Sequence, residues 1–526
     1  MRASRILTRR KFLAVSSAAA GLAVARPYIS RANDRPSITH GVQSGDVGVD
    51  AGVVWARTDR PARMQIEIAT TDSFRDVRQG VFVDALPQSD FTAKALLEDL
   101  PPGQDIFYRI RFQDHSQPTI MSEPAIGRFR TAPQDRRNVS FVWGGDVGGQ
   151  GWGIDEARGG MRSFATMLRN RPDFFVHSGD TIYADHPLQA EVKLADDTMW
   201  KNVLAEAKSK PAETLDEYRG NYKYNLTDKS VLAMNAEIPI FAQWNDHEVS
   251  NNWWPEEPIG RGEHKLRGYL EQNMLAMAAR AARAFHEYML LRTTLAEVNR
   301  VYRKLSYGPL LDVVMIDTRS YRGPNAENME ESYGPSAHGL GPAQVAWLKR
   351  TLKASTAQWK VIACDLPLAL PRIYDGQRRW GHESLSQGDG GPPRGREHEL
   401  ADILSFIKRE SIRNTIWITA DVHYAAAHYF DPNKATFQDF EPFWEFVAGP
   451  LHAGTGRAFP PDATFGPQVV FEKSAPRDSR VNHGPSYGMQ FFGHVAIEGA
   501  TGVMAVSLKD MNDTLLWSRK LEPNKT

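Results

Sequence analysis

The sequence is almost free of cysteine, since Cys364 is the one cysteine among 526 residues. An intramolecular disulfide framework and a metal cluster held by several cysteines are therefore excluded. Neither sign of charge is in excess, because 63 basic residues face 63 acidic ones, and we expect no nucleic acid as a stable partner. Cys364 lies inside an apolar run, which predicts a small, buried hydrophobic side chain.

Long hydrophobic runs are also missing. The apolar stretch from Phe12 to Ala25 is shorter than the ~20 residues that a membrane-spanning helix needs, and no later run is long enough. We therefore expect no membrane span in the mature chain. A composition of 41% hydrophobic and 24% charged residues is that of a soluble globular protein, and the length predicts more than one domain.

The N-terminal segment differs from the rest of the chain. Residues 1–32 contain seven basic residues and no acidic ones, with a short apolar stretch and small residues behind them. This order predicts a signal peptide. Residues 8–13, Thr-Arg-Arg-Lys-Phe-Leu, are similar to a twin-arginine export signal. We expect the twin-arginine export machinery as a partner and a periplasmic or secreted protein, cleaved after Ala25 or Ala32. An N-terminal amphipathic helix that is retained is the alternative.

Behind the signal, short runs with β-type patterns are separated by turn residues. Residues 52–56, 64–69 and 106–112 alternate or are rich in β-branched side chains, and Pro101-Pro102-Gly103 marks a turn between them. Several short strands in fewer than about 100 residues are typical of a small β-sandwich. We expect such an N-terminal domain over residues 36–132.

From Asn138 onward, apolar strand patterns alternate with helical ones. Residues 140–144, 160–170 and 174–177 predict a β-α-β unit. Later strands are expected at 313–316, 359–363 and 415–418, and a long alanine-rich helix at 265–289. The fold class is therefore α/β: a layered α/β sandwich with a β-rich tail, spanning residues 138–522.

Polar side chains that bind metals follow several of these strands. They are Asp146, Asp180, the run Asn245, Asp246 and His247, and the pair Asp421 and His423. In α/β sheets, sites form beyond the carboxyl ends of strands, so we expect these segments to converge. Carboxylate and imidazole groups suit hard or borderline metals, and the lack of cysteine argues against structural zinc. Each signal taken alone is also explained by a turn cap or a buried histidine.

The order of these motifs resembles the calcineurin-like metallophosphoesterase superfamily, and more narrowly the alkaline phosphatase D (PhoD) family. The segments that carry the resemblance are 178–183 (Ser-Gly-Asp-Thr-Ile-Tyr), 244–253 (Trp-Asn-Asp-His-Glu-Val-Ser-Asn-Asn-Trp), 316–322 (Ile-Asp-Thr-Arg-Ser-Tyr-Arg) and 420–423 (Ala-Asp-Val-His). The front segment 40–46 (His-Gly-Val-Gln-Ser-Gly-Asp) is similar to the start of that family's N-terminal β domain. The likeness covers nearly the whole mature chain. It implies a metallophosphoesterase-type sandwich over 138–522.

The resemblance also implies a metal centre with two ions, iron and calcium, with zinc or manganese as alternatives. The ligands of the first ion would be Asp146, Asp180, Tyr183 and His423. Asp180 would bridge to the second ion, which Asp421 and either Asn245 or Asp246 would hold. The family commonly has a cysteine where Asp146 stands, so the identity of the metal stays open. An additional histidine that many superfamily members supply has no clear match, and His382 and His398 are the nearby candidates.

The implied activity is hydrolysis of a phosphate ester by a metal-activated water. Two neighbouring metals would neutralise the ester's charge and lower the pKa of that water. His247 would protonate the leaving group, or orient a neighbouring ligand. Arg162 would clamp a phosphate oxygen, or serve as an ordinary helix-face charge. Arg319 is expected to hold the scaffold through ion pairs.

The expected substrates are small phosphate esters or the phosphodiesters of phospholipids and polymers. A catalytically silent envelope binding protein on the same fold is the second interpretation, motivated by Asp146 and by the missing histidine. An exported metal-dependent oxidoreductase is the third, because twin-arginine signals often serve redox proteins. Neither a dinucleotide fingerprint nor a cysteine cluster supports that third interpretation.

Overall fold

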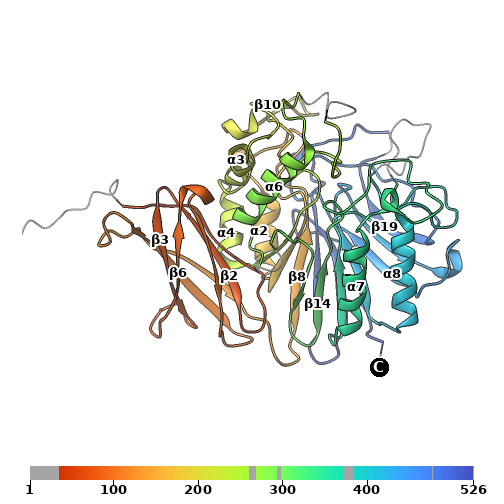
Figure 1. Ribbon diagram of the computed structural model, residues 1–526, viewed down its shortest axis with the longest axis horizontal. Coiled ribbons are helices and arrows are strands. Elements are labelled where there is room, and N and C mark those ends of the chain that lie inside the picture. Colours follow the sequence, from red (N-terminus) through yellow and green to blue (C-terminus); the bar gives the residue numbers. More distant parts are fainter. Residues whose placement is uncertain (1–34, 260–267, 293–297, 372–382, 477, 525–526) are drawn as a thin grey trace, which may run out of the picture.

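Two large β-sheets pack face to face, and helices cover their outer faces (Figure 1). This computed structural model describes residues 35–259, 268–292, 298–371, 383–476 and 478–524. The predicted class, a layered α/β sandwich preceded by a small β-rich region, is confirmed. The predicted signal peptide, residues 1–32, lies outside the described residues.

The first sheet has nine strands in the order β22-β21-β20-β8-β9-β12-β1-β2-β5. Its central parallel strands include β8 (Val139–Gly144), β9 (Phe174–Ser178) and β12 (Ile240–Gln243). Their sequences are nearly continuous apolar runs because both faces of the sheet are covered. The antiparallel strands on one side are β20 (Phe491–Ile497), β21 (Met504–Asp510) and β22 (Leu515–Leu521).

The second sheet has seven strands in the order β13-β14-β15-β16-β18-β17-β19. Four are parallel: β14 (Leu311–Met315), β15 (Trp359–Ala363), β16 (Thr415–Thr419) and β18 (Phe443–Val447). The others are antiparallel to their neighbours: β13 (Arg303–Ser306), β17 (Ala425–Phe430) and β19 (Pro467–Lys473). The predicted strands at 313–316, 359–363 and 415–418 all lie in this sheet.

The main core lies between the two sheets. Phe174 of β9 stacks on Phe141 of β8 at 4.9 Å and on Phe241 of β12 at 4.4 Å between ring centroids. Val313 and Val361 belong to the same fully buried cluster on the facing sheet. Alternate side chains of each parallel strand point to this core and the rest point to the helices, which fixes the register of both sheets.

Helices form the two outer layers. Those over the first sheet are α2 (Arg162–Arg169), α3 (Leu215–Asn225), α4 (Lys229–Glu237) and α6 (Met274–Tyr288), and those over the second are α7 (Pro342–Ala354) and α8 (Glu397–Arg409). Short 3₁₀ turns occupy Pro87–Ser89, Glu156–Arg158, Glu206–Lys208, Pro335–Ala337, Pro432–Lys434 and Pro485–Tyr487. None of the described helices combines the length and the apolar character that crossing a membrane requires. Cys364 is fully buried beneath α7 and α8, as predicted.

The alanine-rich helix is shorter than predicted. Its expected start at Lys265 lies outside the described residues, and residues 268–273 are not helical. The helix begins at Met274 because Asn273 caps it: the Asn273 side chain accepts a hydrogen bond of 3.1 Å from the Ala276 amide.

The N-terminal region is a sandwich whose two sheets differ in their connections. One is a separate sheet formed by β4 (Arg78–Ala85), β3 (Ala62–Ala69), β6 (Asp105–Asp114) and β7 (Ala125–Arg130). The other consists of β1 (Ile38–Gly45), β2 (Gly52–Thr58) and β5 (Thr92–Leu97), which continue the nine-stranded sheet because β1 pairs in parallel with β12. Their buried residues share one hydrophobic cluster with the main core.

Helix α8 carries a buried acid with a pH-dependent effect on stability. Burial, together with the nearby Asp462 carboxylate, raises the pKa of Glu397 to about 9. The folded chain then keeps a proton that the unfolded chain releases near pH 4.5, so the free energy of unfolding falls as pH rises between these values. One such group changes it by at most about 1.4 kcal/mol per pH unit.

Glu397→Gln removes this titration, so its unfolding free energy should decline less than that of the wild type between pH 5 and pH 9. Urea denaturation at several pH values measures the two slopes, and the exposed Glu441→Gln is the matched control. Equal slopes for wild type and Glu397→Gln would contradict this assignment.

Candidate metal centre

The predicted ligands follow the carboxyl ends of parallel strands in both sheets. Asp146 follows β8, Asp180 follows β9, Asn245 follows β12 and Asp421 follows β16. Because the two sheets pack face to face with these strands in the middle of each, the loops that leave them meet above the core (Figure 1).

Four of the predicted metal ligands have a backbone conformation in the left-handed region. The φ angles are 67° at Asp146, 49° at Asp180, 69° at Asp421 and 61° at His423. Residues other than glycine adopt this conformation rarely, and it is enriched where surrounding structure enforces a functional geometry. The sharp turn after each strand directs the side chain back across the strand ends.

The first group joins Asp146, Asp180 and His423, whose ligand atoms all lie within 4.8 Å of one another. His423 Nε2 lies 3.4 Å from Asp146 Oδ1 and accepts a hydrogen bond of 2.7 Å from the Tyr183 hydroxyl. His423 Nδ1 donates to the Gly454 carbonyl, which leaves Nε2 as the nitrogen that faces the carboxylates. This is the arrangement of a histidine that ligates a metal through Nε2.

The second group surrounds the other side of Asp180. The Asn245 amide donates to Asp421 Oδ1 at 2.8 Å and to Asp180 Oδ2 at 3.5 Å, while Asn245 Oδ1 accepts from Arg319 Nε at 2.8 Å. Asp246 forms a further group of ligand atoms with Asp180 and His247 within the same 4.8 Å limit. Both Asn245 and Asp246 therefore border Asp180.

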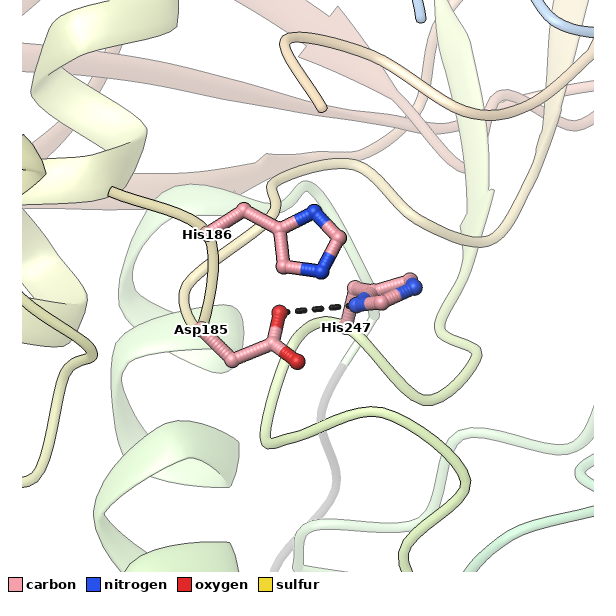
Figure 2. A group of neighbouring side chains, drawn as sticks. All are labelled: Asp185, His186 and His247. Carbon is pink, nitrogen blue, oxygen red and sulfur yellow. Dashed lines mark hydrogen bonds and ion pairs between the residues drawn. The ribbon is translucent and has the colours of Figure 1, made fainter. Parts of the chain in front are cut away.

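Two neighbours of His247 were missed by the sequence analysis. His247 Nδ1 donates to Asp185 Oδ1 at 2.7 Å. The ring of His186 lies on the same side, next to the Asp185 carboxylate (Figure 2). The three side chains offer ligand atoms within 4.8 Å of one another. Their signal in the sequence is the pair Asp185-His186, which begins two residues after Tyr183 of the Gly-Asp-Thr-Ile-Tyr motif.

The buried carboxylates of this cluster create an electrostatic environment that favours bound cations. Burial, and then the charges of Asp246, Glu248, Asp146 and Asp421, raise the pKa of Asp180 well above its ordinary value. Burial and the Asp180 carboxylate likewise raise the pKa of the Tyr183 phenol. Asp146 Oδ2 is buried and has no hydrogen-bond partner among the described residues. Clustered carboxylate oxygens whose charges repel one another fit hard metal ions.

Comparison with known proteins gives a consistent result. The sequence profile of the PhoD-like phosphatase family matches residues 141–508, which is more than half of the chain. The profile of the PhoD-like phosphatase N-terminal domain matches residues 21–133. The chain belongs to the PhoD-like phosphatase family. It is therefore a phosphoric ester hydrolase by family.

Individual relatives of this PhoD-like phosphatase agree with the assignment. Alkaline phosphatase D of Bacillus subtilis (strain 168) is 26% identical over 479 residues, which cover 85% of this chain and 76% of the relative. A solved structure of PhoD superposes with a TM-score of 0.66 at 20% identity, covering 92% of each chain. A purple acid phosphatase from yellow lupin (Lupinus luteus) seeds superposes with a TM-score of 0.56 at 11% identity, over 93% of this chain and 74% of that one. The last two show a shared fold.

Buried polar side chains hold the ligand loops of this PhoD-like phosphatase together. Glu248 Oε1 accepts from the backbone amide and the hydroxyl of Thr181 at 2.6 and 2.7 Å. Glu248 Oε2 accepts from the backbone amide of Asn245 at 2.9 Å. Asn225 donates to the Thr181 carbonyl at 2.8 Å and to the Val147 carbonyl at 3.5 Å. Neither role was predicted, because each needs contacts between loops that are distant in the sequence.

Two arginines differ in their relation to the cluster. Arg319 is fully buried and pairs with Glu383 at 2.8 Å, as expected of a scaffold ion pair, and it also lies 3.9 Å from Asp421. Arg162 is exposed, and its guanidinium donates to Asn512 at 3.1 Å. The structure therefore does not bring Arg162 to the predicted metal ligands.

Of the two candidates for the additional histidine, the structure describes His398 and not His382. His398 lies on α8 with its Nε2 3.1 Å from the Glu330 carbonyl oxygen, and no group of ligand atoms includes it among the described residues. His382 lies outside the described residues. His186 is the histidine that the structure places beside His247.

Proposed function

We propose that the protein is an exported phosphoesterase with two metal ions, which hydrolyses phosphate monoesters, phosphodiesters or both. The single observation that carries the proposal is the convergence of buried carboxylates and histidines at the strand ends, centred on Asp180. The family match supports a phosphate ester as the substrate, and the mutual repulsion of the carboxylates around Asp180 supports bound metal ions.

The proposed division of ligands follows the two sides of Asp180. Asp146, Tyr183 and His423 would hold the first ion with Asp180, and iron is its proposed identity. Asp180 and Asp421 would hold the second ion, proposed to be calcium, with Asn245 and Asp246 as the alternative third donors. Asp146 gives the first site a carboxylate in place of a thiolate, which favours a harder metal; zinc and manganese are the other candidates. Bound ions would offset the phosphate's charge and lower the pKa of the attacking water.

His247 is proposed to serve the leaving group. Its Nδ1 donates to Asp185, so the ring is held with Nε2 directed to the side of Asp246, 3.9 Å away. Water attacks phosphorus, the bond between phosphorus and the ester oxygen breaks, and Nε2 in its protonated form gives the departing alcohol its proton. Asp185 stabilises the cationic ring and fixes its orientation. Arg162 has no part in this proposal.

Export rests on the sequence of residues 1–32. The double arginine in Thr-Arg-Arg-Lys-Phe-Leu and the short apolar stretch behind it support transport by the twin-arginine machinery into the periplasm or beyond. The mature domains are proposed to cover 36–132 and 138–522, the second being the metallophosphatase domain.

The test is release of p-nitrophenol from p-nitrophenyl phosphate and from bis-p-nitrophenyl phosphate by the protein supplied with iron and calcium. We expect turnover that a chelator abolishes and that added metal restores, because the carboxylate cluster has no catalytic substitute for the ions. Metal content by mass spectrometry identifies the bound elements. A folded protein that binds metal but hydrolyses neither ester would contradict the proposal and favour a silent binding protein.

A further inference from the structure

A cleft of about 690 Å³ lies beside the metal centre. One wall is the hairpin of β10 (Glu191–Lys193) and β11 (Met199–Lys201), and the other is the segment 480–487. Trp152, Arg480, His483 and Tyr487 are among the side chains that line it. None of the predicted metal ligands lines this cleft, so it is a separate feature of the described residues.

Hydrogen bonds connect the cleft to the loops that carry the catalytic candidates. Asn482, a lining residue, donates to the Gln150 carbonyl at 3.2 Å, and the Gln150 amide donates to His186 Nδ1 at 3.0 Å. The backbone amide of Asn482 also donates to the Thr455 carbonyl at 2.9 Å. Thr455 follows Gly454, whose carbonyl accepts a hydrogen bond from His423. The cleft therefore adjoins both His186 and His423 through two short links.

The walls of the cleft present aromatic rings. His483 and Tyr487 stack with 4.2 Å between ring centroids and 13° between planes, and Tyr487 remains 46% exposed. Trp152 is buried, and its indole donates to Asn482 Oδ1 at 2.9 Å, which connects Trp152 to the segment 480–487. A half-exposed ring that lines a cleft and is held in place by stacking on a second ring can stack with a further planar group.

The charges of the cleft leave one guanidinium available to a ligand. Lys193 pairs with Asp197 at 2.6 Å, and Arg158 lies 3.5 Å from Asp155 and donates to Thr198. Arg480 has no hydrogen bond or ion pair from its side chain among the described residues, and it is exposed. Guanidinium groups stack on planar rings as well as pairing with anions.

We propose that this cleft binds the alcohol portion of the phosphate ester, and that this portion carries a planar aromatic ring, as in a nucleotide. The inference rests on the proposed function, since the phosphate would lie at the metal centre while the ring would stack on Tyr487, with the Arg480 guanidinium available from the same wall of the cleft. The substrate class is then an ester of a nucleoside-like or aryl alcohol. Tyr487 and Arg480 are residues that determine specificity.

The test measures binding by the full-length protein supplied with metals, using two ligands that it cannot hydrolyse. One is the phosphonate of adenosine 5′-monophosphate in which a CH₂ group replaces the bridging oxygen, and the other is propylphosphonate, which has no ring. Titration calorimetry gives both dissociation constants. We expect the adenosine phosphonate to bind roughly tenfold more tightly, since one stacked base contributes about that factor or more.

Tyr487→Ala should remove this preference while leaving the binding of propylphosphonate unchanged, and Arg480→Gln should reduce it. The matched control is Phe82→Ala, an aromatic residue that is 56% exposed on β4, in the separate N-terminal sheet. A preference that is absent in the wild type, or that survives Tyr487→Ala, overturns the proposal. Hydrolysis of p-nitrophenyl phosphate is assayed on the same preparations, so failure of the phosphoesterase function is seen independently of failure of the cleft.

Discussion

Asp180→Asn should abolish ester hydrolysis, with a loss of at least about 10³-fold in kcat, while the protein stays folded. A loss of that size corresponds to ~4 kcal/mol of barrier height. Asp180 is the residue that both groups of ligand atoms share, with Asp146 and His423 on one side and Asp246 and His247 on the other. An asparagine keeps the shape but offers one oxygen, so it cannot serve two cations.

The same substitution should not destabilise the metal-free protein. The pKa of Asp180 is raised because burial and four neighbouring carboxylates disfavour its charge, and asparagine removes that charge at nearly constant volume. We therefore expect the free energy of unfolding of the metal-free variant to equal or exceed that of the wild type. The prediction thus separates a catalytic loss from a folding defect by the sign of the stability change.

Three measurements check it: turnover, metal content and urea denaturation in chelator. Asp99→Asn is the matched control, because Asp99 also has a left-handed backbone, with φ 55°, but is exposed beyond β5. The control should retain full turnover and metal. Wild-type turnover in Asp180→Asn would contradict the proposed role of Asp180 in holding the metals. Loss of folding would contradict the predicted stability of the metal-free variant.

Much of the candidate site was predictable because its residues lie just beyond the carboxyl ends of strands, which the sequence pattern reveals. Asp146, Asp180 and Asp421 each come directly after an apolar run, and parallel strands bring such positions together at one edge of a sheet. The run Asn-Asp-His-Glu adds a pattern specific to the family resemblance. Local sequence and the general geometry of parallel sheets were sufficient for these residues.

The residues that were missed act through contacts between loops. Glu248 links Thr181 to the Asn245 amide, and Asp185 orients His247, yet each resembles an ordinary acidic residue in a polar turn. For Arg162 the sequence left two interpretations, a phosphate clamp and a charge on the helix face. The exposed side chain, which donates to Asn512, agrees with the second. Which way a loop side chain points depends on tertiary packing that the sequence pattern does not contain.

Sheet continuity was also beyond the sequence. The patterns at 52–56 and 106–112 predict strands correctly, but nothing in them indicates that β1 pairs with β12 over a separation of about 195 residues, with Gly45 opposite Ile240. The pairing is possible because Gly45 has no side chain: a Cβ there would lie 2.4 Å from the Ile240 carbonyl oxygen. The alanine-rich helix begins later than its composition predicts because Asn273 caps it at Met274.

The second large effect concerns stability where the N-terminal strands join the rest of the fold. Asp46, directly after β1, is fully buried and accepts two hydrogen bonds from Arg303 of β13, at 2.6 and 2.8 Å. It also accepts from the Arg292 amide at 2.8 Å, while Arg303 donates to the Ala242 carbonyl on β12 at 2.9 Å. One ion pair thus connects β1, β12 and β13.

Asp46→Gly should lower the free energy of unfolding by about 3–5 kcal/mol, because it leaves the buried Arg303 guanidinium without its carboxylate. Glycine is the suitable replacement, since Asp46 has a φ of 43° and glycine adopts that conformation without strain. Urea denaturation measures the change. The matched control is Asp84→Gly, which breaks the exposed pair of Asp84 with Arg63 on β3 and should cost less in ionic energy, about 1 kcal/mol or below.

A double variant distinguishes loss of an attractive pair from burial of an unpaired charge. If the cost arises mainly from the isolated guanidinium, then Asp46→Gly combined with Arg303→Met should be more stable than Asp46→Gly alone, since methionine needs no counter-charge. If the double variant is less stable than Asp46→Gly, the hydrogen bond from Arg303 to the Ala242 carbonyl on β12 is what stabilises the contact between the N-terminal strands and the rest of the fold. A loss below about 1 kcal/mol in Asp46→Gly would mean that water reaches this pair and that packing, rather than charge, joins the N-terminal strands to the catalytic sheets.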